Sequence, residues 1–394
     1  MPGYRIRWLQ RFGIFKPRQH ELKAVWVHAV SVGEVIAAIP LVKALLTRGD
    51  IHVMITTMTP TGSDRVLAAF GTQVEHVYAP YDLPWTTPAF LKRFQPQAII
   101  IMETELWPNM ITACAKRQLP LILANARLSE RSAKKYARFA KTTHSIFNML
   151  THVAAQSQND AARYIRLGLP KAKVSVTGNI KFDLDLSDTL RLEAAHLKKA
   201  YSLNGARRVW IAASTHDDEE RRILDTFKTL LKNHPNLLLI IVPRHPERFE
   251  EVYELSTTDF KTARRSTYET PSKDVQVLLG DTMGEMLLLY GASDMAFIGG
   301  SLIPRGGHNM IEAAAWGLPI ICGPHTFNFE DIAQRLEQYG GMQTVENERA
   351  LEIRMQHWLS DHHAPRQTGK QALAFAEDNR GGMEKLLTIL EDHI

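Results

Sequence analysis

The sequence has little cysteine and no long apolar run. Its 394 residues include two cysteines, Cys114 and Cys322, and neither belongs to a CxxC or Cys/His spacing of the kind that binds zinc. We therefore expect neither a disulfide framework nor a structural zinc site, as is typical of proteins from a reducing compartment. No segment approaches the roughly 18 apolar residues of a transmembrane helix, and the polar, basic start shows no signal peptide.

Several short catalytic motifs are also missing. The sequence contains no HExxH, GxSxG or P-loop pattern, which argues against a zinc hydrolase, a serine hydrolase and a P-loop kinase. The acidic pair Asp183 and Asp185 has the DxD spacing of metal-dependent glycosyltransferases. Because this pair falls in a polar segment between two predicted domains, we assign it a structural role and expect no metal.

Positive charge is in modest excess, with a formal net charge of +5. The excess favours anionic partners such as nucleotides, phosphorylated glycolipids, phospholipid surfaces or nucleic acid, although an enzyme without a polyanionic partner is also compatible with it. Charge is dense at the start, where residues 4–16 interleave Arg5, Arg7, Arg11 and Lys16 with aromatic and aliphatic side chains. This segment either lies on an anionic bilayer or packs as a helix on its own domain.

Valine- and isoleucine-rich runs alternate with helical patterns along the chain, which predicts parallel sheets covered on both faces. We predict an α/β protein with two Rossmann-like, doubly wound domains, residues 1–182 and 189–380. Ligands of such sheets bind beyond the carboxyl ends of the strands, so two facing domains would hold the site in a cleft between them. The expected strands are 24–29, 52–56, 74–78, 98–102, 119–124, 153–156, 174–177, 208–213, 237–242, 276–279, 295–298 and 320–322.

The segment 298–329 predicts a nucleotide or nucleotide-sugar site. Gly306 and Gly307 let the backbone approach a ligand closely, and Asn309 stands where a helix should begin, as a favoured N-cap. A helix N-terminus suits a phosphate. One turn further, the carboxylate of Glu312 is placed to accept hydrogen bonds from ribose hydroxyls. The alternative is an ordinary βαβ connection whose glycines serve only turn geometry, because a lone glycine loop is a weak signal.

Polar residues follow the first two strands of the first domain. Glu34 opens a helix after strand 24–29 and is a candidate general base, although it would equally complement the helix N-terminus. The hydroxyl-rich segment 56–63 follows strand 52–56. It is suited either to binding a phosphate or sugar or to capping the next helix.

Two glutamates follow strand 98–102. We expect one of Glu103 and Glu105 to face the cleft and the other to bind backbone N–H groups of the helix that begins near Pro108. Arg127 follows the next strand, and it would pair with one of these glutamates or with an anionic substrate.

The second domain has similar strand ends. Arg244 follows strand 237–242 and is placed either for a phosphate, through its planar guanidinium, or for a surface ion pair. Gly284, in the loop 280–285, allows close approach to a ligand, and residues 214–216 form a further polar strand end. Several such loops at one cleft argue for an enzyme with a nucleotide-activated donor.

Together these residues resemble the Kdo transferases, which transfer 3-deoxy-D-manno-octulosonic acid (Kdo) in Gram-negative lipopolysaccharide assembly. The resemblance spans nearly the whole chain. It is carried, in order, by residues 28–34 (HAVSVGE), 56–62 (TTMTPTG), 102–109 (METELWPN), 124–129 (ANARLS), 178–183 (GNIKFD), 242–248 (VPRHPER), 280–285 (GDTMGE), 306–309 (GGHN) and 323–329 (GPHTFNF).

The resemblance implies a GT-B glycosyltransferase whose C-terminal helix, within residues 381–394, crosses back to the first domain. The implied donor is CMP-Kdo, and the implied acceptor is the tetraacylated lipid A precursor (lipid IVA). Transfer inverts the anomeric centre, releases CMP and is expected more than once per acceptor. No cofactor and no metal are implied, because an arginine and a helix N-terminus can stabilise the leaving phosphate.

The same resemblance implies three groups of site residues, with Glu34 as the general base. The catalytic group is Glu34, Glu103 and Arg127. The donor-binding group is Pro243, Arg244, Gly284, Glu285, Gly307, His308, Asn309 and Glu312, of which Asn309 contacts phosphate and Glu312 contacts ribose. The acceptor-binding group is Ser31, Thr57 and Lys181.

Family members commonly begin with a hydrophobic anchor before a segment like residues 4–15. We therefore expect attachment to the cytoplasmic face of the inner membrane, either peripherally or through an anchor missing from this chain, and no nucleic-acid partner. Two alternatives stay open. One is another GT-B enzyme, such as a sugar-nucleotide epimerase or a UDP-sugar transferase, and the other is a nucleotide-binding regulatory protein without turnover.

Overall fold

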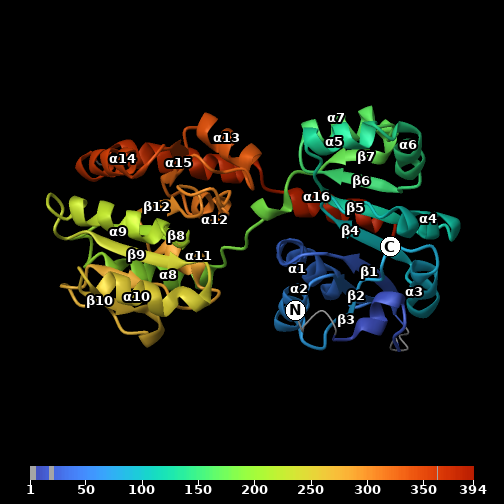
Figure 1. Ribbon diagram of the computed structural model, residues 1–394, viewed down its shortest axis with the longest axis horizontal. Helices are drawn as coiled ribbons and strands as arrows, with labels where there is room; N and C mark the ends of the chain where they lie inside the picture. Colours follow the sequence, from blue (N-terminus) through green and yellow to red (C-terminus); the bar gives the residue numbers. More distant parts are fainter. Residues whose placement is uncertain (1–5, 17–21, 362) are drawn as a thin grey trace. The chain divides into compact units, whose positions relative to one another are not determined.

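The computed structural model describes residues 6–16, 22–361 and 363–394, so Tyr4 and Arg5 of the basic N-terminal segment lie outside the described residues. The chain divides into two compact units. Unit 1 comprises residues 1–183 and 379–394, and unit 2 comprises residues 184–378. The last residues of the chain therefore belong to the unit in which the chain begins (Figure 1).

Unit 1 is built on a seven-stranded sheet of order β3-β2-β1-β4-β5-β6-β7, with parallel pairing throughout. Its strands are β1 (Lys23–His28), β2 (Ile51–Thr57), β3 (Glu75–Tyr78), β4 (Ala98–Met102), β5 (Leu121–Ala126), β6 (His152–Ala155) and β7 (Val174–Val176). Every residue of β4 and β5 is buried. Burial on both faces is the reason these strands read as continuous apolar runs rather than as alternating ones.

Helices cover both faces of this sheet (Figure 1). On one face Trp26 and Phe90 lie at the centre of the core, and on the other α1 packs with Leu386 and Leu390 of the C-terminal helix. The helices of unit 1 are α1 (Val32–Thr47), α2 (Pro60–Phe70), α3 (Thr86–Phe94), α4 (Pro108–Lys116), α5 (Glu130–Ala137), α6 (Ala140–Asn148), α7 (Gln158–Arg166) and α16 (Gly382–Glu391).

Unit 2 has a second seven-stranded parallel sheet, of order β10-β11-β9-β8-β12-β13-β14. Its strands are β8 (Val209–Thr215), β9 (Leu238–Pro243), β10 (Thr262–Arg264), β11 (Val277–Leu279), β12 (Met295–Ile298), β13 (Ile320–Cys322) and β14 (Met342–Thr344). Its helices are α8 (Asp188–Tyr201), α9 (Glu219–Leu230), α10 (Phe249–Thr257), α11 (Met286–Gly291), α12 (Ile311–Ala315), α13 (Glu330–Gln338), α14 (Glu348–Ser360) and α15 (His363–Asp378).

The predicted α/β class with two parallel sheets is confirmed. The edge strands β10 and β14 were not predicted. Each has three residues and is only partly buried, so neither carries the apolar run that identifies a central strand in the sequence.

Both sheets reverse their winding at the first strand of the unit. In unit 1, β1 lies between β2 and β4, and in unit 2, β8 lies between β9 and β12. The crevice beyond the carboxyl ends of strands at such a switch point is where ligands of open α/β sheets bind. Each unit therefore offers one position for a site.

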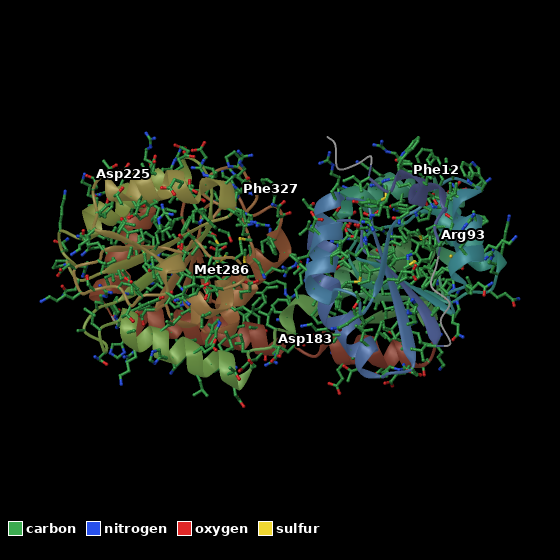
Figure 2. All side chains as sticks on the ribbon, turned by 90° about the horizontal axis from the view of Figure 1, so that it is seen from below. Phe12, Arg93, Asp183, Asp225, Met286 and Phe327 are labelled. Carbon is green, nitrogen blue, oxygen red and sulfur yellow. The ribbon has the colours of Figure 1, made fainter. Side chains whose placement is uncertain are left out.

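The N-terminal segment packs on unit 1. A short 3₁₀ helix, Trp8–Phe12, places Phe12 (labelled in Figure 2) against the ring of Trp85, with stacked centroids 5.8 Å apart. Arg11 is buried and donates to the Met58 carbonyl at 3.0 Å. Trp8 and Leu9 nevertheless remain 53% and 60% exposed, so the segment packs on its own unit and still presents apolar side chains outward. No described helix has the length and apolarity needed to cross a membrane.

Asp183 binds the start of α16. Its two carboxylate oxygens accept hydrogen bonds from the backbone N–H groups of Gly381 and Met383, each at 2.6 Å. Gly381 adopts a left-handed conformation, with φ 87°, and Asp183 (labelled in Figure 2) lies where the chain leaves unit 1. Both oxygens of Asp183 are therefore engaged in a backbone cap, which is a structural role.

Candidate functional site

Glu34 lies at the start of α1, beyond the carboxyl end of β1. Its Oε2 accepts the Val30 N–H at 2.7 Å and its Oε1 accepts the Ser31 hydroxyl at 3.1 Å. Ser31 is the N-cap of the helix, and its Oγ accepts the Glu34 N–H at 3.4 Å. The two side chains thus form a variant of the capping box, in which Glu34 accepts the Val30 N–H in place of the N–H of the N-cap residue. Glu34 complements the helix N-terminus, as one interpretation of the sequence proposed.

Capping does not exclude a role as a base. The pKa of Glu34 is raised from 4.5 to about 7, chiefly by burial and also by the charges of Glu105 and Glu103, against the lowering effect of the Val30 and Ser31 hydrogen bonds. A carboxyl group that titrates near neutral pH is well matched to general base catalysis. Glu34 therefore caps the helix and also has a pKa near neutral pH.

Glu103 turns the chain directly after β4. Its φ of 56° is left-handed, and its Oε1 lies 2.7 Å from the Lys181 ammonium. Glu105 instead accepts the indole N–H of Trp107 at 2.7 Å. The prediction that one of the two glutamates would bind the N-terminus of α4 is wrong, because Asp82 accepts the N–H groups of residues 109 and 110 at 3.0 and 2.8 Å.

Arg127 and Thr57 differ in what they leave open. Arg127 is exposed, and within the described residues its guanidinium makes no hydrogen bond or ion pair, so it does not pair with a glutamate. Thr57 is fully buried, and its hydroxyl is shared between the Thr59 carbonyl and His76. The predicted acceptor contact of Thr57 therefore has no exposed atom to support it.

Asn125 organises this end of the sheet, and the sequence did not identify it. It is buried with φ 52° at an irregularity in β5. Its Oδ1 accepts the Ile180 N–H at 3.2 Å, which fixes the segment that carries Lys181. The available sequence signal was an asparagine between two alanines at the end of a strand, because asparagine tolerates the left-handed conformation better than most residues.

Unit 2 brings two histidines into direct contact. His216 follows β8 and His308 follows β12, and their Nε2 atoms lie 2.7 Å apart, with the rings stacked at 5.0 Å between centroids. Burial lowers the pKa of His216 to about 4 and that of His308 to about 3. Nearby positive charges, including Arg244, act in the same direction. Both rings are therefore neutral in the unliganded protein.

Arg244 and Arg305 surround this pair without a counterion. Both are exposed, and within the described residues neither guanidinium forms an ion pair or a hydrogen bond. Arg248 differs, since it pairs with Glu220 at 3.1 Å. The surface ion pair considered for Arg244 is thus not formed. Uncompensated arginines beside neutral histidines make a site that favours an anion.

The helix after the glycine loop begins later than predicted. α12 starts at Ile311, and Asn309 is not its N-cap, but its Oδ1 still accepts the Ile311 N–H at 3.1 Å. The Asn309 amide donates to Glu312 at 3.0 Å. Burial raises the pKa of the Glu312 carboxyl, against the opposing effects of Asn309 and Arg244. Asn309 and Glu312 therefore form one hydrogen-bonded unit.

The first glycine loop, after β12, is already occupied by a carboxylate. Glu219 is fully buried, and its oxygens accept the N–H groups of Gly300, Ser301 and Leu302 at 2.7, 3.1 and 3.0 Å. Three successive N–H groups that converge on one anion form a nest. Burial raises the pKa of Glu219 to about 7, and these hydrogen bonds oppose the rise. These N–H groups cannot also bind a phosphate.

The chain is similar in sequence to known proteins of one family. Residues 6–184 match the family model described as 3-deoxy-D-manno-octulosonic-acid transferase (kdotransferase). The chain is 42% identical over 401 residues to the 3-deoxy-D-manno-octulosonic acid transferase of Haemophilus influenzae, covering 100% of this chain and 92% of that protein. It is 37% identical over 382 residues to the enzyme of the same name from Bordetella pertussis, covering 93% and 87%.

The chain belongs to the Kdo transferase family. The crystal structure of UDP-GlcNAc 2-epimerase from Neisseria meningitidis is similar with a TM-score of 0.61 at 15% identity, over 94% of this chain and 100% of that one. At this identity the likeness shows the GT-B fold alone. The predicted family is confirmed, and the chain is a Kdo-transferring glycosyltransferase of lipopolysaccharide biosynthesis.

Of three further predicted donor residues of this Kdo transferase, one is already engaged by the protein itself. Glu285 forms a two-pronged ion pair with Arg265, at 2.7 and 3.1 Å, and also accepts the Thr282 hydroxyl. Gly284 is exposed and left-handed with φ 86°, and Pro243 is a buried strand end. Their donor contacts stay predictions, and for Glu285 such a contact would have to share or replace Arg265.

The glycine pair of the Kdo transferase has a structural reason to be glycine. A Cβ on Gly306 would lie 2.5 Å from the Phe327 ring and from the Asn328 amide, and Gly306 and Gly307 have φ of 95° and 70°. The segment 323–329 folds over this loop, and the Asn328 N–H donates to the Gly306 carbonyl at 3.0 Å. Close approach of the chain to itself, rather than to a ligand, requires Gly306.

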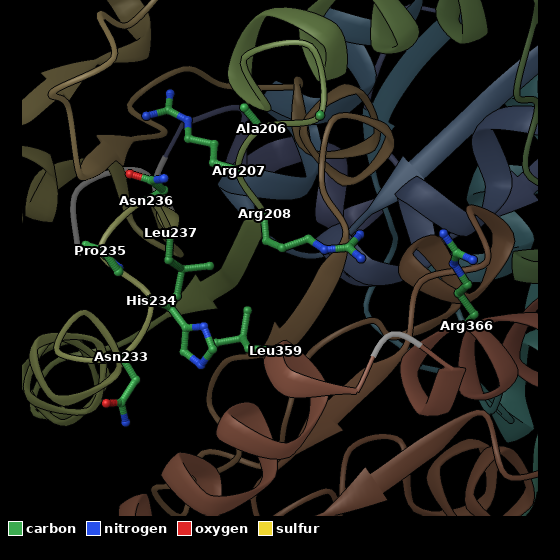
Figure 3. Close-up of a pocket in the computed structure, with 11 residues that line it drawn as sticks. Ala206, Arg207, Arg208, Asn233, His234, Pro235, Asn236, Leu237, Leu359 and Arg366 are labelled. Carbon is green, nitrogen blue, oxygen red and sulfur yellow. The ribbon is translucent and has the colours of Figure 1, made fainter.

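A pocket of about 540 Å³ opens elsewhere in unit 2, around the residues that precede β8 and β9. Arg207, Arg208 and His234 are among its lining residues. The guanidinium groups of Arg207 and Arg208 point in different directions (Figure 3), and Arg207 is held by the Val275 and Lys273 carbonyls. The pocket lies at the amino ends of the strands, so it is separate from the switch-point site.

Proposed function

We propose that this Kdo transferase moves Kdo from CMP-Kdo to a hydroxyl group of the tetraacylated lipid A precursor, with inversion at the anomeric carbon. The observation that carries the proposal is Glu34, a buried carboxyl group with a pKa of about 7 at the switch point of unit 1. An inverting transfer needs one base to take the proton of the attacking hydroxyl. Glu34 has the protonation behaviour and the position for that role.

The proposed step is a single displacement. The Glu34 carboxylate takes the acceptor proton as the acceptor oxygen forms its bond to the anomeric carbon. The bond from that carbon to the phosphate oxygen breaks, and its electron pair leaves with CMP. Glu103 forms an ion pair with Lys181, 2.7 Å away. Its negative charge helps to hold the Glu34 pKa high, which makes Glu34 a stronger base than an isolated surface glutamate.

The donor is assigned to the switch-point cluster of unit 2. Arg244, Arg305 and the histidine pair supply positive charge and N–H donors for the phosphate of CMP. Asn309 and Glu312, already hydrogen-bonded to each other at 3.0 Å, supply polar groups for the ribose. This assignment gives the leaving phosphate its charge stabilisation from protein side chains, so we expect transfer to need no metal.

The acceptor and the membrane are assigned to unit 1. Arg127 is exposed, its guanidinium has no partner within the described residues, and its backbone N–H donates to the Glu103 carbonyl at 3.3 Å. The lipid A precursor is anionic. The 3₁₀ helix Trp8–Phe12 exposes Trp8 and Leu9, and Trp85 beside it is 55% exposed. Interfacial aromatic side chains with nearby cations favour an anionic bilayer surface. We propose attachment at the cytoplasmic face of the inner membrane.

A product assay tests the reaction. Purified protein is incubated with CMP-Kdo and the tetraacylated precursor, and the products are identified by mass spectrometry. We expect masses with one or more added Kdo units and release of CMP, both undiminished after thorough chelation. A product of retained configuration would contradict the single displacement, and loss of activity on chelation would contradict metal independence.

Vesicle co-sedimentation tests the membrane assignment. We expect binding to vesicles that contain phosphatidylglycerol to exceed binding to neutral phosphatidylcholine vesicles, and the Trp8→Ala, Leu9→Ala double variant to lose most of it. Tyr268, which is 69% exposed in unit 2, provides a matched control as Tyr268→Ala. Equal loss in the control, or no preference for anionic vesicles, would contradict the assignment.

A further inference from the structure

The hydrogen bond between His216 and His308 in unit 2 determines how many protons the two rings can bind. The two Nε2 atoms are 2.7 Å apart, so one ring donates its Nε2–H and the other accepts with a lone pair. The donating ring is then unprotonated at its Nδ1. Within the described residues neither Nδ1 has a hydrogen-bond partner. The neutral pair therefore has one vacant position for a proton, on the Nδ1 of the donating ring.

A proton added at that position strengthens the existing contact. The donating ring becomes an imidazolium, and its bond to the second ring becomes a charge-assisted hydrogen bond. A second added proton would place N–H groups against each other across 2.7 Å, which the geometry forbids. The pair is therefore built to gain one proton and not two.

The surroundings decide when that proton is gained. The charges that act on the two rings are those of Arg244, Arg305, Arg248 and His245. Two carboxyl groups lie nearby: Glu219, which is contacted by the His216 backbone, and Glu312, which is hydrogen-bonded to Asn309. Arg248 is neutralised by acidic partners, whereas within the described residues Arg244 and Arg305 form no ion pair. Without an anion, these charges oppose protonation of either ring. An anion placed among them would offset these charges and so favour the protonated form of the pair.

We infer that the His216–His308 pair takes up one proton when the donor's phosphate binds beside Arg244. This inference rests on the proposed function, because it takes the CMP moiety to occupy this cluster. The resulting imidazolium adds a positive charge only while the phosphate is present. CMP leaves a sugar as a dianion, so the charge is available when negative charge develops on the phosphate. His216 thereby joins His308 as a site residue.

Calorimetry of CMP binding tests the inference directly. CMP is titrated into the full-length protein at pH 7.5 in several buffers that differ in ionisation enthalpy, and the dependence of the observed enthalpy gives the number of protons bound. We expect uptake on the order of one proton in the wild type, by linkage between binding and protonation. His216→Gln and His308→Gln keep a polar atom near Nε2 and should each reduce the uptake at least several-fold, while CMP binding weakens but remains measurable.

Two further variants separate the alternatives. His234→Asn, a histidine outside this cluster, should keep the wild-type uptake. Glu312→Gln removes the other buried group near Arg244 whose pKa the site could shift, and it should also keep the uptake. If CMP binds without proton uptake, or if only Glu312→Gln abolishes the uptake, the inference is wrong and the donor assignment stands. If CMP does not bind, the proposed donor site itself fails.

Discussion

Each unit has a seven-stranded parallel sheet with a switch point at its first strand, but the two units differ in strand order and in the charge gathered at the switch point. Beyond β1, unit 1 collects Glu34, Glu103 and Glu105 against one ammonium group, that of Lys181. Beyond β8, unit 2 collects uncompensated arginines around a neutral histidine pair. Two units of the same fold class thus gather acidic side chains in one and basic side chains in the other, and the proposed function uses the first to accept a proton and the second to bind the phosphate. A transferase that deprotonates a hydroxyl and releases a phosphate needs both.

The largest expected effect on the contrast between the two units comes from a substitution of Glu34. We expect Glu34→Gln to lower kcat by about 10²- to 10⁴-fold, the usual contribution of a general base, without weakening CMP binding. In the wild type, activity should fall as pH drops below about 7, where Glu34 becomes protonated. Steady-state kinetics across pH, with Glu384→Gln as a surface control in unit 1, measures both effects. Near-normal turnover would remove Glu34 from the role of base.

The free energy of unfolding of the same variant provides an independent test of the raised pKa of Glu34. Because the folded pKa of Glu34 lies above its ordinary value, ionisation costs stability, and this cost grows as pH rises from about 4.5 to about 7. Removing the charge should therefore leave the free energy of unfolding at pH 8 unchanged or higher. Denaturant unfolding at pH 5 and pH 8 checks this expectation, and a clear loss at pH 8 would mean that the cap dominates.

On the basic side, Arg244→Ala should produce the next largest effect. Loss of a hydrogen bond to a charged group costs roughly 1.5–3 kcal/mol, or about 10- to 100-fold in CMP affinity. Arg221→Ala, an exposed arginine of α9, should leave the affinity within about twofold, because surface charges contribute little. Calorimetric titration with CMP distinguishes the two. An unchanged affinity in Arg244→Ala would place the phosphate elsewhere.

Glu219→Gln tests whether the loop beneath the basic cluster is positioned by the buried nest. The amide group of glutamine would direct N–H donors at backbone N–H groups, at a cost of roughly 1–3 kcal/mol. We expect a higher donor KM and a lower melting temperature, with kcat for bound substrate less affected. A fall in kcat without a change in donor KM would contradict a positioning role.

The smallest expected effects concern the Glu103–Lys181 pair of unit 1. Here the direction of a pH shift, rather than its size, tests the role of the pair. Glu103→Gln removes a negative charge near Glu34 and should shift the acid limb of the pH–activity profile to lower pH. Lys181→Met leaves Glu103 without its partner at 2.7 Å and should shift the limb to higher pH. Each shift should be several tenths of a unit to about one unit. Shifts in the same direction would show that the pair does not act on Glu34 electrostatically.

The sequence predicted the central strands and the position of Glu34, because both follow from local patterns. Continuous apolar runs identify strands buried on two faces, and a serine three residues before a glutamate identifies a helix start. It failed where the partner is distant along the chain. Asp82, rather than Glu105, binds the start of α4, and no local pattern links residues so far apart.

The same reason explains which contacts in unit 2 the sequence did not predict. Residues 214–216 were recognised as a polar strand end, but the partner of His216 is His308, which follows another strand. Likewise, in the first glycine loop, after β12, the backbone N–H groups of residues 300–302 are bound by the carboxylate of Glu219, from the start of α9. The family resemblance supplied names for donor residues. Only the fold shows which of them, such as Glu285 with Arg265, are already engaged.

The cap that Asp183 places on α16 has a consequence for synthesis of the chain. Leu386 and Leu390 complete one face of the unit 1 core, and they are synthesised after all of unit 2. Unit 2 is continuous in sequence, so it can finish folding during translation, although its residues are made after most of unit 1. Unit 1 must wait for the final helix. A chain that stops at residue 378 would contain a complete unit 2 and an incomplete unit 1 with an uncovered core.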